Sequence, residues 1–228
     1  VEVWMRVELD PVPGEEGEDL GTELREVLAA VRDVAADEWR IADAVHAVAA
    51  ELAGIAAAER REAAELLGWL AAGRFTFLGY RRGPDADGLG TLRRPGPTNG
   101  HLPGPGADRP LVVVTRADAP SLVLRPDRPF EVVIDGEHRF VGLFPGAALH
   151  EPVLDTPVVG RRVLAAIHLA GVPLASYSGQ RMLEVLAHLP REELFWATPE
   201  DLHETAVGVL TLAQGRRLRL SLRREPYG

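Results

Sequence analysis

The 228-residue sequence predicts a protein of the α+β class. An apolar heptad pattern near the N-terminus predicts helix, short apolar runs between 111 and 144 predict strands, and capping signals after 155 predict further helices. Because the strands come first, then the helices and then a last basic strand, we expect an α+β sandwich of a sheet and helices.

The N-terminal third is expected to be mainly helical. Alternating apolar and charged residues over 1–10 predict one half-buried strand. From Leu20 to Ile55, apolar residues recur at steps of four and three, which predicts a long helix or helical hairpin packed along a partner surface. The Asp37-Glu38-Trp39 region is a candidate break. A second helix is predicted over about 59–72, with Gly73 as its C-terminal cap.

The middle of the chain is expected to form the sheet. An aromatic run at 75–80 predicts a buried strand, whereas 83–110, with 7 Gly and 6 Pro in 28 positions, predicts a mobile loop without a core. Asp135-Gly136 predicts a tight hairpin, because glycine accepts the positive φ that such a turn requires. The other predicted strands are 111–115, 121–125, 130–134 and 139–144.

The C-terminal part is expected to be helical up to a last strand. Helix starts are predicted at Thr156-Pro157, at Ser178 and at Thr198-Pro199, from their capping residues. The corresponding ends are predicted at Gly171, Pro190 and Gly215. Alternating Arg and Leu residues in 216–225 predict a strand with one apolar and one solvated basic face.

Composition excludes several classes of function. The chain has no Cys and no Lys, so it holds no disulfide, thiol nucleophile, Schiff-base lysine or Walker A lysine. The net charge is -9 and the pI is near 5.3, which argues against a nucleic-acid partner. No apolar run is long enough for a membrane helix. The absence of cysteine fits a reducing compartment.

Partial catalytic motifs in the sequence are incomplete. His203-Glu204 begins like the zinc-protease H-E-x-x-H, but Val207 stands where the second histidine belongs. Gly88-x-Gly90 lacks the rest of a dinucleotide fingerprint, and no βαβ unit surrounds it. Three residues of a proline-containing loop are interpreted as solvated side chains and not as metal ligands: His150, Glu151 and Asp155. We therefore predict no catalytic, cofactor-binding or metal site.

Four separated motifs resemble the N-terminal region of the large bacterial NAD-specific glutamate dehydrogenases. They are EAAELLGWLAAGRFTFLGY at 62–80, RFVGLF at 139–144, PREELF at 190–195 and RRLRLSLRREPYG at 216–228. The resemblance covers essentially the whole chain. It implies an ACT-like, ferredoxin-like antiparallel sheet with helices, and it places the family's catalytic and Rossmann domains far downstream of this segment.

The resemblance also implies a domain organisation and a function. Residues 1–10 would be the last strand of a preceding ACT-like module, 11–73 a helical linker, and 74–228 an ACT-like domain with a disordered Gly/Pro loop at 83–110. The segment would be a noncatalytic regulatory and assembly part of an enzyme that converts L-glutamate, NAD and water to 2-oxoglutarate, ammonium and NADH. NAD would bind elsewhere in the parent enzyme, and this segment would hold no cofactor.

Several partners and a cytoplasmic location follow from the same resemblance. The expected partners are the downstream catalytic domain of the same chain, further copies in a homo-oligomer (a tetramer), and an amino-acid effector. Polar and basic side chains near strand ends suit the carboxylate of such an effector. The candidate effector-binding residues are Ser121, Arg125, His138 and Arg139.

The sequence departs from the family at two places near this site. Leu124 stands where the family tends to have the histidine of a Ser-x-x-His-Arg motif, and Pro145-Gly146 begins a segment that is usually Thr-Ser-x-Ala-Tyr. If those polar residues form a ligand pocket, the departures imply a lost or altered specificity. The alternative interpretation is a stand-alone amino-acid-sensing or protein-interaction module. It is distinguished by a reading frame that stops near Gly228 and encodes no dinucleotide-binding fold.

Overall fold

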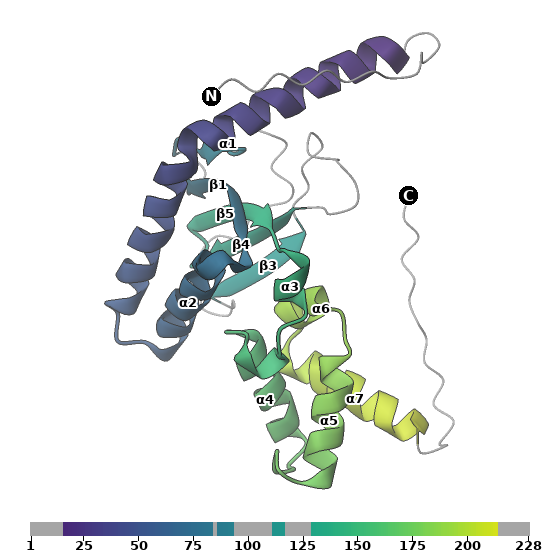
Figure 1. The fold of residues 1–228 in the computed structure, drawn as a ribbon. Helices are drawn as coiled ribbons and strands as arrows, with labels where there is room; N and C mark the ends of the chain where they lie inside the picture. Colours follow the sequence, from purple (N-terminus) through teal and green to yellow (C-terminus); the bar gives the residue numbers. More distant parts are fainter. Residues whose placement is uncertain (1–15, 84–85, 94–110, 117–128, 214–228) are drawn as a thin grey trace.

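A computed structural model describes residues 16–83, 86–93, 111–116 and 129–213 of the chain (Figure 1). The predicted strands at 1–10, 121–125 and 216–225, and the predicted helix end at Gly215, lie outside these residues. In the described part, helices come first, the strands follow, and a second group of helices comes last. The α+β class and the antiparallel sheet are confirmed.

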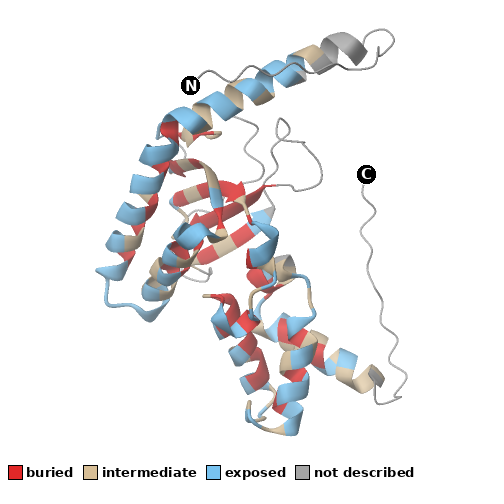
Figure 2. Cartoon of the chain, in the orientation of Figure 1, coloured by how far each residue is buried: buried red, intermediate tan, exposed pale blue. Residues whose placement is uncertain are grey.

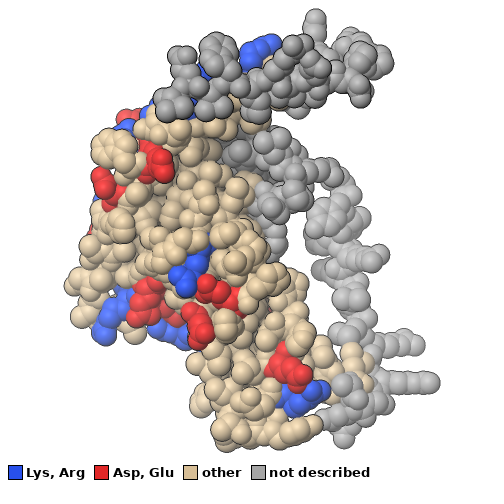
Figure 3. Space-filling view, viewed as in Figure 1, with Lys and Arg blue, Asp and Glu red and all other residues tan. Residues whose placement is uncertain are grey.

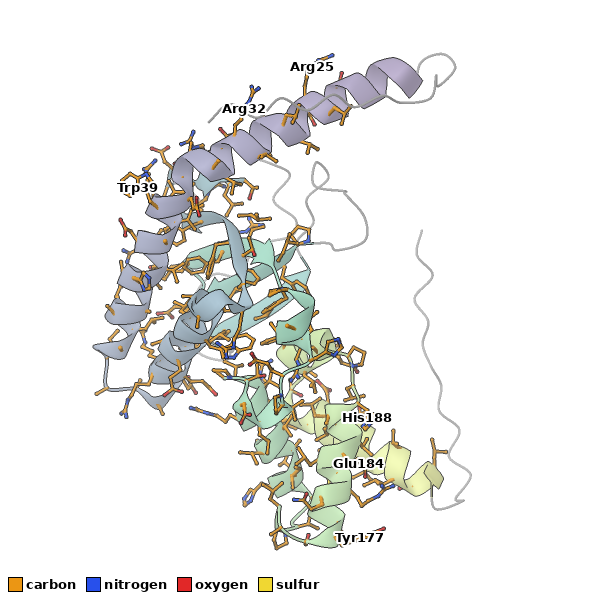
Figure 4. All side chains as sticks on the ribbon, in the orientation of Figure 1. Arg25, Arg32, Trp39, Tyr177, Glu184 and His188 are labelled. Atoms are coloured by element: carbon orange, nitrogen blue, oxygen red, sulfur yellow. The ribbon has the colours of Figure 1, made fainter. Side chains whose placement is uncertain are left out.

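The heptad region forms one helix, α1 (Glu16–Ala53), and not a hairpin. The helix is continuous through Asp37, but it changes direction near Trp39 (Figures 1 and 4). After this point, the heptad side chains Ile41, Val45, Val48 and Leu52 are buried, because this half of α1 packs along the sheet. The expected partner surface of this half is therefore the protein's own core.

The second predicted helix is α2 (Ala58–Trp69), which packs against α1 and continues into a wider helical turn, η1 (Leu70–Arg74). Gly73 has φ of +82°, a left-handed conformation that favours glycine. It ends the helix as predicted, and the chain enters the first strand of the sheet directly afterwards.

Five antiparallel strands form one sheet in the order β2-β1-β5-β4-β3. Their bounds are β1 Thr76–Arg82, β2 Leu89–Gly90, β3 Val112–Arg116, β4 Phe130–Ile134 and β5 His138–Leu143. The β4–β5 hairpin turns at Asp135 and Gly136, with φ of 55° and 68°, which confirms the predicted tight turn. The short strand β2 corrects the prediction that 83–110 is a loop throughout.

Six shorter elements follow the sheet. They are α3 (Gly146–Leu149), η3 (Val153–Asp155), α4 (Val159–Leu169), α5 (Tyr177–Ala187), α6 (Arg191–Trp196) and α7 (Pro199–Ala213). Thr198 caps α7 as predicted, since its hydroxyl accepts from the Asp201 N–H at 3.2 Å. The Ser178 prediction is wrong. Ser176 caps α5 by accepting from the Gly179 N–H at 3.1 Å, and Ser178 lies inside the first turn.

The elements form two packed parts that share a core. The sheet unit consists of α1, α2 and the five strands, and the helical unit consists of α4 to α7 (Figures 1 and 2). Side chains of α1 and α2 cover one face of the sheet, while α6 packs against β3 at its edge. In an ACT-like unit, helices alternate with strands as βαββαβ. Here the described helices precede and follow the sheet, so the ACT-like identity stays a prediction.

No helix among the described residues is both long enough and apolar enough to cross a membrane.

Candidate functional site

The structure describes two of the four predicted effector residues. Ser121 and Arg125 lie outside the described part of the chain. His138 and Arg139 are neighbours at the start of β5, and successive side chains of a strand point to opposite faces of the sheet. The two are therefore not brought together, and the four-residue effector site stays a prediction.

His138 lies on the sheet face that α1 and α2 cover, and only 4% of its surface is exposed. Its Nδ1 is hydrogen-bonded to the Tyr80 hydroxyl at 3.0 Å, and the two rings stack with 6.2 Å between centroids. Burial, reinforced by the charge of Arg82, lowers the pKa of His138 below its ordinary value of 6.5. The imidazole is therefore held neutral as part of the core.

Protonation of His138 is expected to destabilise the fold. Because its pKa is lower in the folded than in the unfolded chain, the stability that the neutral ring contributes is present above pH 6.5 and is lost as the pH falls below that value. His138→Phe removes the group that is protonated, and with it this loss of stability. When the pH is lowered from about 7 to about 5, across the ordinary histidine pKa, we expect the melting temperature of the variant to fall less than that of the wild type. His46→Gln, at an exposed position of α1, serves as the control and is expected to leave the wild-type pH profile unchanged.

Arg139 lies on the opposite face of the sheet, within a group of three charged side chains. Its Nε is paired with the Glu131 carboxylate on β4, and Arg81 on β1 stands directly across from it in the strand register. Arg81 and Glu131 are buried, at 9% and 8% exposure. The group carries one net positive charge, which suits a carboxylate ligand.

Three of the four motifs that carry the resemblance meet in space. Phe144, at the end of the 139–144 motif, packs edge-on against Phe75 of the first motif with 4.8 Å between ring centroids. On its other side, it stacks on Phe195 of the 190–195 motif at 5.4 Å. Trp69 lies 6.3 Å from the same ring. These aromatic residues join the sheet unit to the helical unit, and we call this region the junction.

Glu151 is the polar centre of the junction. One carboxylate oxygen accepts from Trp69 Nε1 at 3.0 Å, and the other accepts from Arg74 Nε at 2.6 Å. Arg191 of α6 donates to the backbone carbonyl of Glu151, and the Arg74 guanidinium lies 5.7 Å from the Trp69 ring centroid. Burial opposes ionisation of Glu151, but the two donors outweigh it and lower the pKa of the carboxyl.

The interpretation of Glu151 as a solvated loop side chain is therefore wrong. Its partners precede it by 82 and 77 positions, so no local spacing pattern could indicate the contacts. The interpretation as solvated loop side chains fits His150 and Asp155 better than it fits Glu151. His150 and Asp155 are exposed, as solvated loop side chains would be.

Glu151→Ala is expected to weaken the junction. The variant leaves the Trp69 N–H and the Arg74 guanidinium without their shared acceptor, so we expect the melting temperature to fall by about 2 to 4 °C. Glu184→Ala removes an exposed carboxylate of α5 that pairs with the exposed Arg181 of the same helix, and it serves as the control (Figure 4). Equal melting temperatures for the two variants would contradict the role of Glu151.

A second side chain ties the two units together. Arg162 of α4 donates to the carbonyl oxygen of Phe195 and, at 3.2 Å, to that of Val112 on β3. The residue is partly buried, and this burial lowers the pKa of its guanidinium. Next to it, Arg161 reaches Glu62 of α2 at 2.9 Å. Elsewhere, on the face seen in Figure 3, acidic and basic side chains lie in small mixed groups.

The sequence of the chain is similar to those of known proteins. Residues 156–215, which include the whole helical unit, match the family model described as "Glutamate dehydrogenase, helical motif 1". A protein of Mycobacterium tuberculosis named NAD-specific glutamate dehydrogenase is 35% identical over 167 residues, which is 66% of this chain and 10% of that protein.

Two further proteins with the same name also match. The one from Halomonas elongata is 32% identical over 113 residues, which is 46% of this chain and 7% of that protein. The one from Pseudomonas aeruginosa is 32% identical over 127 residues, which is 52% of this chain and 8% of that protein. The chain thus spans 7–10% of the length of the curated relatives it matches. These matches and the sequence motifs show that the chain resembles a fragment of a large NAD-specific glutamate dehydrogenase.

Proposed function

We propose that the chain is a noncatalytic assembly and regulatory segment of an NAD-dependent glutamate dehydrogenase. The observation that carries the proposal is the junction, where family motifs meet in a packed aromatic and ionic cluster and not around a group of reactive side chains. The chain also has no lysine and no cysteine, so two common nucleophiles are missing. Other parts of the parent enzyme then catalyse the oxidation of L-glutamate with NAD.

The proposal assigns a mechanical role to the junction. Phe144, Glu151 and Arg162 connect the sheet unit to the helical unit through rings, a carboxylate and a guanidinium. Contacts of this kind fix the angle between two packed units, because each contact needs both units in place. A segment built in this way can position neighbouring domains of the parent chain and further copies of it in a homo-oligomer.

The test compares the full-length parent with this chain in glutamate-dependent reduction of NAD. We expect activity in the parent and none in the 228-residue chain. Parent protein carrying Glu151→Ala is expected to keep the chemistry but to lose activity at a lower temperature than the wild type, whereas Glu184→Ala is expected to match the wild type. Reduction of NAD by the chain alone would contradict the noncatalytic assignment. An inactive parent would remove the dehydrogenase assignment.

An amino-acid effector is a second part of the proposal. It is supported by the charged group on the face of the sheet opposite α1 and α2, where Arg139 and Arg81 stand across from each other and Glu131 offsets one charge. A bound carboxylate would raise the melting temperature through its preference for the folded chain, by RT ln(1 + [L]/Kd). The ACT-like identity belongs to the same proposal, since ACT-like modules of this family often bind amino acids.

A thermal-shift series tests the effector, with each common L-amino acid titrated until the melting temperature stops rising. We expect one or more of them to stabilise the wild type, and Arg139→Ala to abolish that stabilisation. Arg181→Ala, which replaces an exposed arginine on α5, is expected to retain it. Absence of any shift in the wild type would contradict the effector and leave assembly as the whole role of the segment.

A further inference from the structure

The turn that precedes α4 is held in a backbone conformation that a β-branched residue rarely adopts. Val158 has φ of +69° and ψ of −53°. Across it, the carbonyl oxygen of Pro157 accepts from the Val159 N–H at 2.8 Å. A positive φ together with this hydrogen bond between residues two apart defines the strained form of the γ-turn. Because the branched side chain crowds the backbone in this region, Val158 stores local strain.

Contacts on several sides hold this turn in place. The side chain of Val158 is buried in the shared core. From α2, the Glu62 carboxylate pairs with Arg161 Nε at 2.9 Å, and the Val158 N–H also stabilises its ionised form. On another side, Gly160 packs so closely on Leu154 that a Cβ would come within 2.6 Å of the Leu154 carbonyl oxygen. A strained backbone persists where its surroundings determine it in this way.

Glu62 is the restraint on the turn that comes from the sheet unit. It lies on α2, whereas its partners Val158 and Arg161 lie at the start of the helical unit. Its side chain is only 15% exposed. Burial raises the pKa of Glu62, and the positive charges of Arg161 and Arg162 oppose this rise. If α4 moved away from α2, the turn would lose this restraint and Val158 could relax.

The place of the turn in the chain suits a hinge. Val158 directly precedes α4, and α4 contacts α5, α6 and α7. A change of φ at this one residue would therefore move the four helices together, as hinges at the ends of elements do. Upstream of the turn, Glu151 is bound to Trp69 and Arg74 of the sheet unit. In Figure 1 the helical unit extends away from the sheet, with α6 lying nearest to β3.

We propose that Val158 is the hinge of a two-state device, in which the helical unit is docked on the sheet unit while the turn is strained, and that Glu62 holds the docked state. In the released state, Val158 returns to a negative φ and α4 moves away from α2. The Phe144 ring stack and the Arg162 hydrogen bonds also favour docking, so the released state is the minor one. This device goes beyond the function proposed above and does not depend on it.

Paired substitutions test the strain. Val158→Ala and Val158→Gly both remove the buried side chain, but only glycine accepts a positive φ without strain. We therefore expect Val158→Gly to melt at or above the temperature of Val158→Ala. Val163, fully buried in the middle of α4, is the matched site. There we expect glycine to melt about 2–4 °C below alanine, because glycine weakens a helix interior. A Val158→Gly chain that melts below Val158→Ala would overturn the proposal.

Distances between two spin labels test the hinge. The natural chain has 0 Cys, so labelled cysteines at the exposed Glu59 of α2 and Glu184 of α5 report only the separation of the two units (Figure 4). We expect one main distance in the otherwise unchanged chain. Glu62→Ala is expected to raise the share of a second distance by roughly threefold or more. Glu65→Ala, which removes an exposed acid of the same helix, is the control and is expected to change nothing.

A second variant acts on the turn without touching Glu62. Gly160→Ala forces α4 away from the Leu154 carbonyl, so it is also expected to raise the share of the second distance. Gly208→Ala, on α7, adds a Cβ that meets nothing within 4 Å and is the matched control. Circular dichroism checks that each labelled chain is folded at the temperature used. A second distance that grows in both variants and in neither control supports the hinge. An unchanged distribution in either variant, or an equal change in the controls, would overturn it.

Discussion

Arg162→Gln is expected to destabilise the chain by about 3 kcal/mol. The guanidinium donates to the carbonyls of Phe195 on α6 and Val112 on β3, so it holds both units at once. Removing it leaves two carbonyl oxygens without a donor in a region from which water is largely excluded, at about 1–3 kcal/mol for each such group. Glutamine is too short to reach both acceptors.

The measurement is urea denaturation at about pH 7, followed by circular dichroism. Arg161→Gln is the matched control, because it changes the same residue type one position earlier but removes only a contact whose arginine side chain is 53% exposed. We expect it to cost about 0–1 kcal/mol. If both variants lose the same free energy of unfolding, Arg162 does not act as a tether between the units.

Most of the secondary structure can be predicted from local signals. Gly73 ends the α2–η1 helical segment through a left-handed conformation, and Asp135-Gly136 turns the β4–β5 hairpin through two positive φ angles. These features depend on adjacent residues only, and the sequence shows them directly. The long heptad pattern likewise predicts α1, although the sheet that buries its second half cannot be inferred from the helix itself.

The junction cannot be predicted in the same way. Its contacts join residues far apart in the sequence, as between Arg74 and Glu151, and a lone glutamate in a loop resembles any solvated acid. The β2 strand could not be predicted from the sequence for a related reason. Glycine-rich composition indicates a loop, but the strand is fixed by a contact with α1 that no local pattern contains.

The separation of His138 from Arg139 follows from strand geometry alone. Adjacent residues of a strand point to opposite faces, so the two side chains cannot serve one site on one face of the sheet. A strand is predicted at 139–144, and its alternation already argues against grouping this pair. The same alternation assigns His138 to the core and Arg139 to the charged group that includes Glu131.

Asp37→Asn is expected to release the contact that fixes β2 to α1, with a loss of roughly 2 kcal/mol at neutral pH. The carboxylate is fully buried, with 0% of its surface exposed. It accepts from the Gly90 N–H at 2.8 Å and from two nitrogens of Arg93 at 2.5 and 2.6 Å. Asparagine keeps the size but cannot accept from all these donors.

The pH dependence of this loss identifies the charge as its cause. The hydrogen bonds from Arg93 outweigh burial and lower the pKa of Asp37 from 3.8 to about 2. Because the folded pKa lies below the unfolded one, the carboxylate stabilises the fold above about pH 4, and the contribution is lost as the pH falls towards 2. The difference in free energy of unfolding between wild type and Asp37→Asn should therefore shrink steadily over this range.

Urea denaturation of both proteins in steps from about pH 7 to about pH 2 measures this difference. Asp43→Asn, which replaces an exposed acid on the same helix, controls for the general loss of negative charge and is expected to differ little from the wild type throughout. A difference for Asp37→Asn that stays constant with pH would show that shape, and not ionisation, gives Asp37 its role. A difference that disappears near about pH 2 would locate the stabilisation in the ionised carboxylate that binds Gly90 and Arg93.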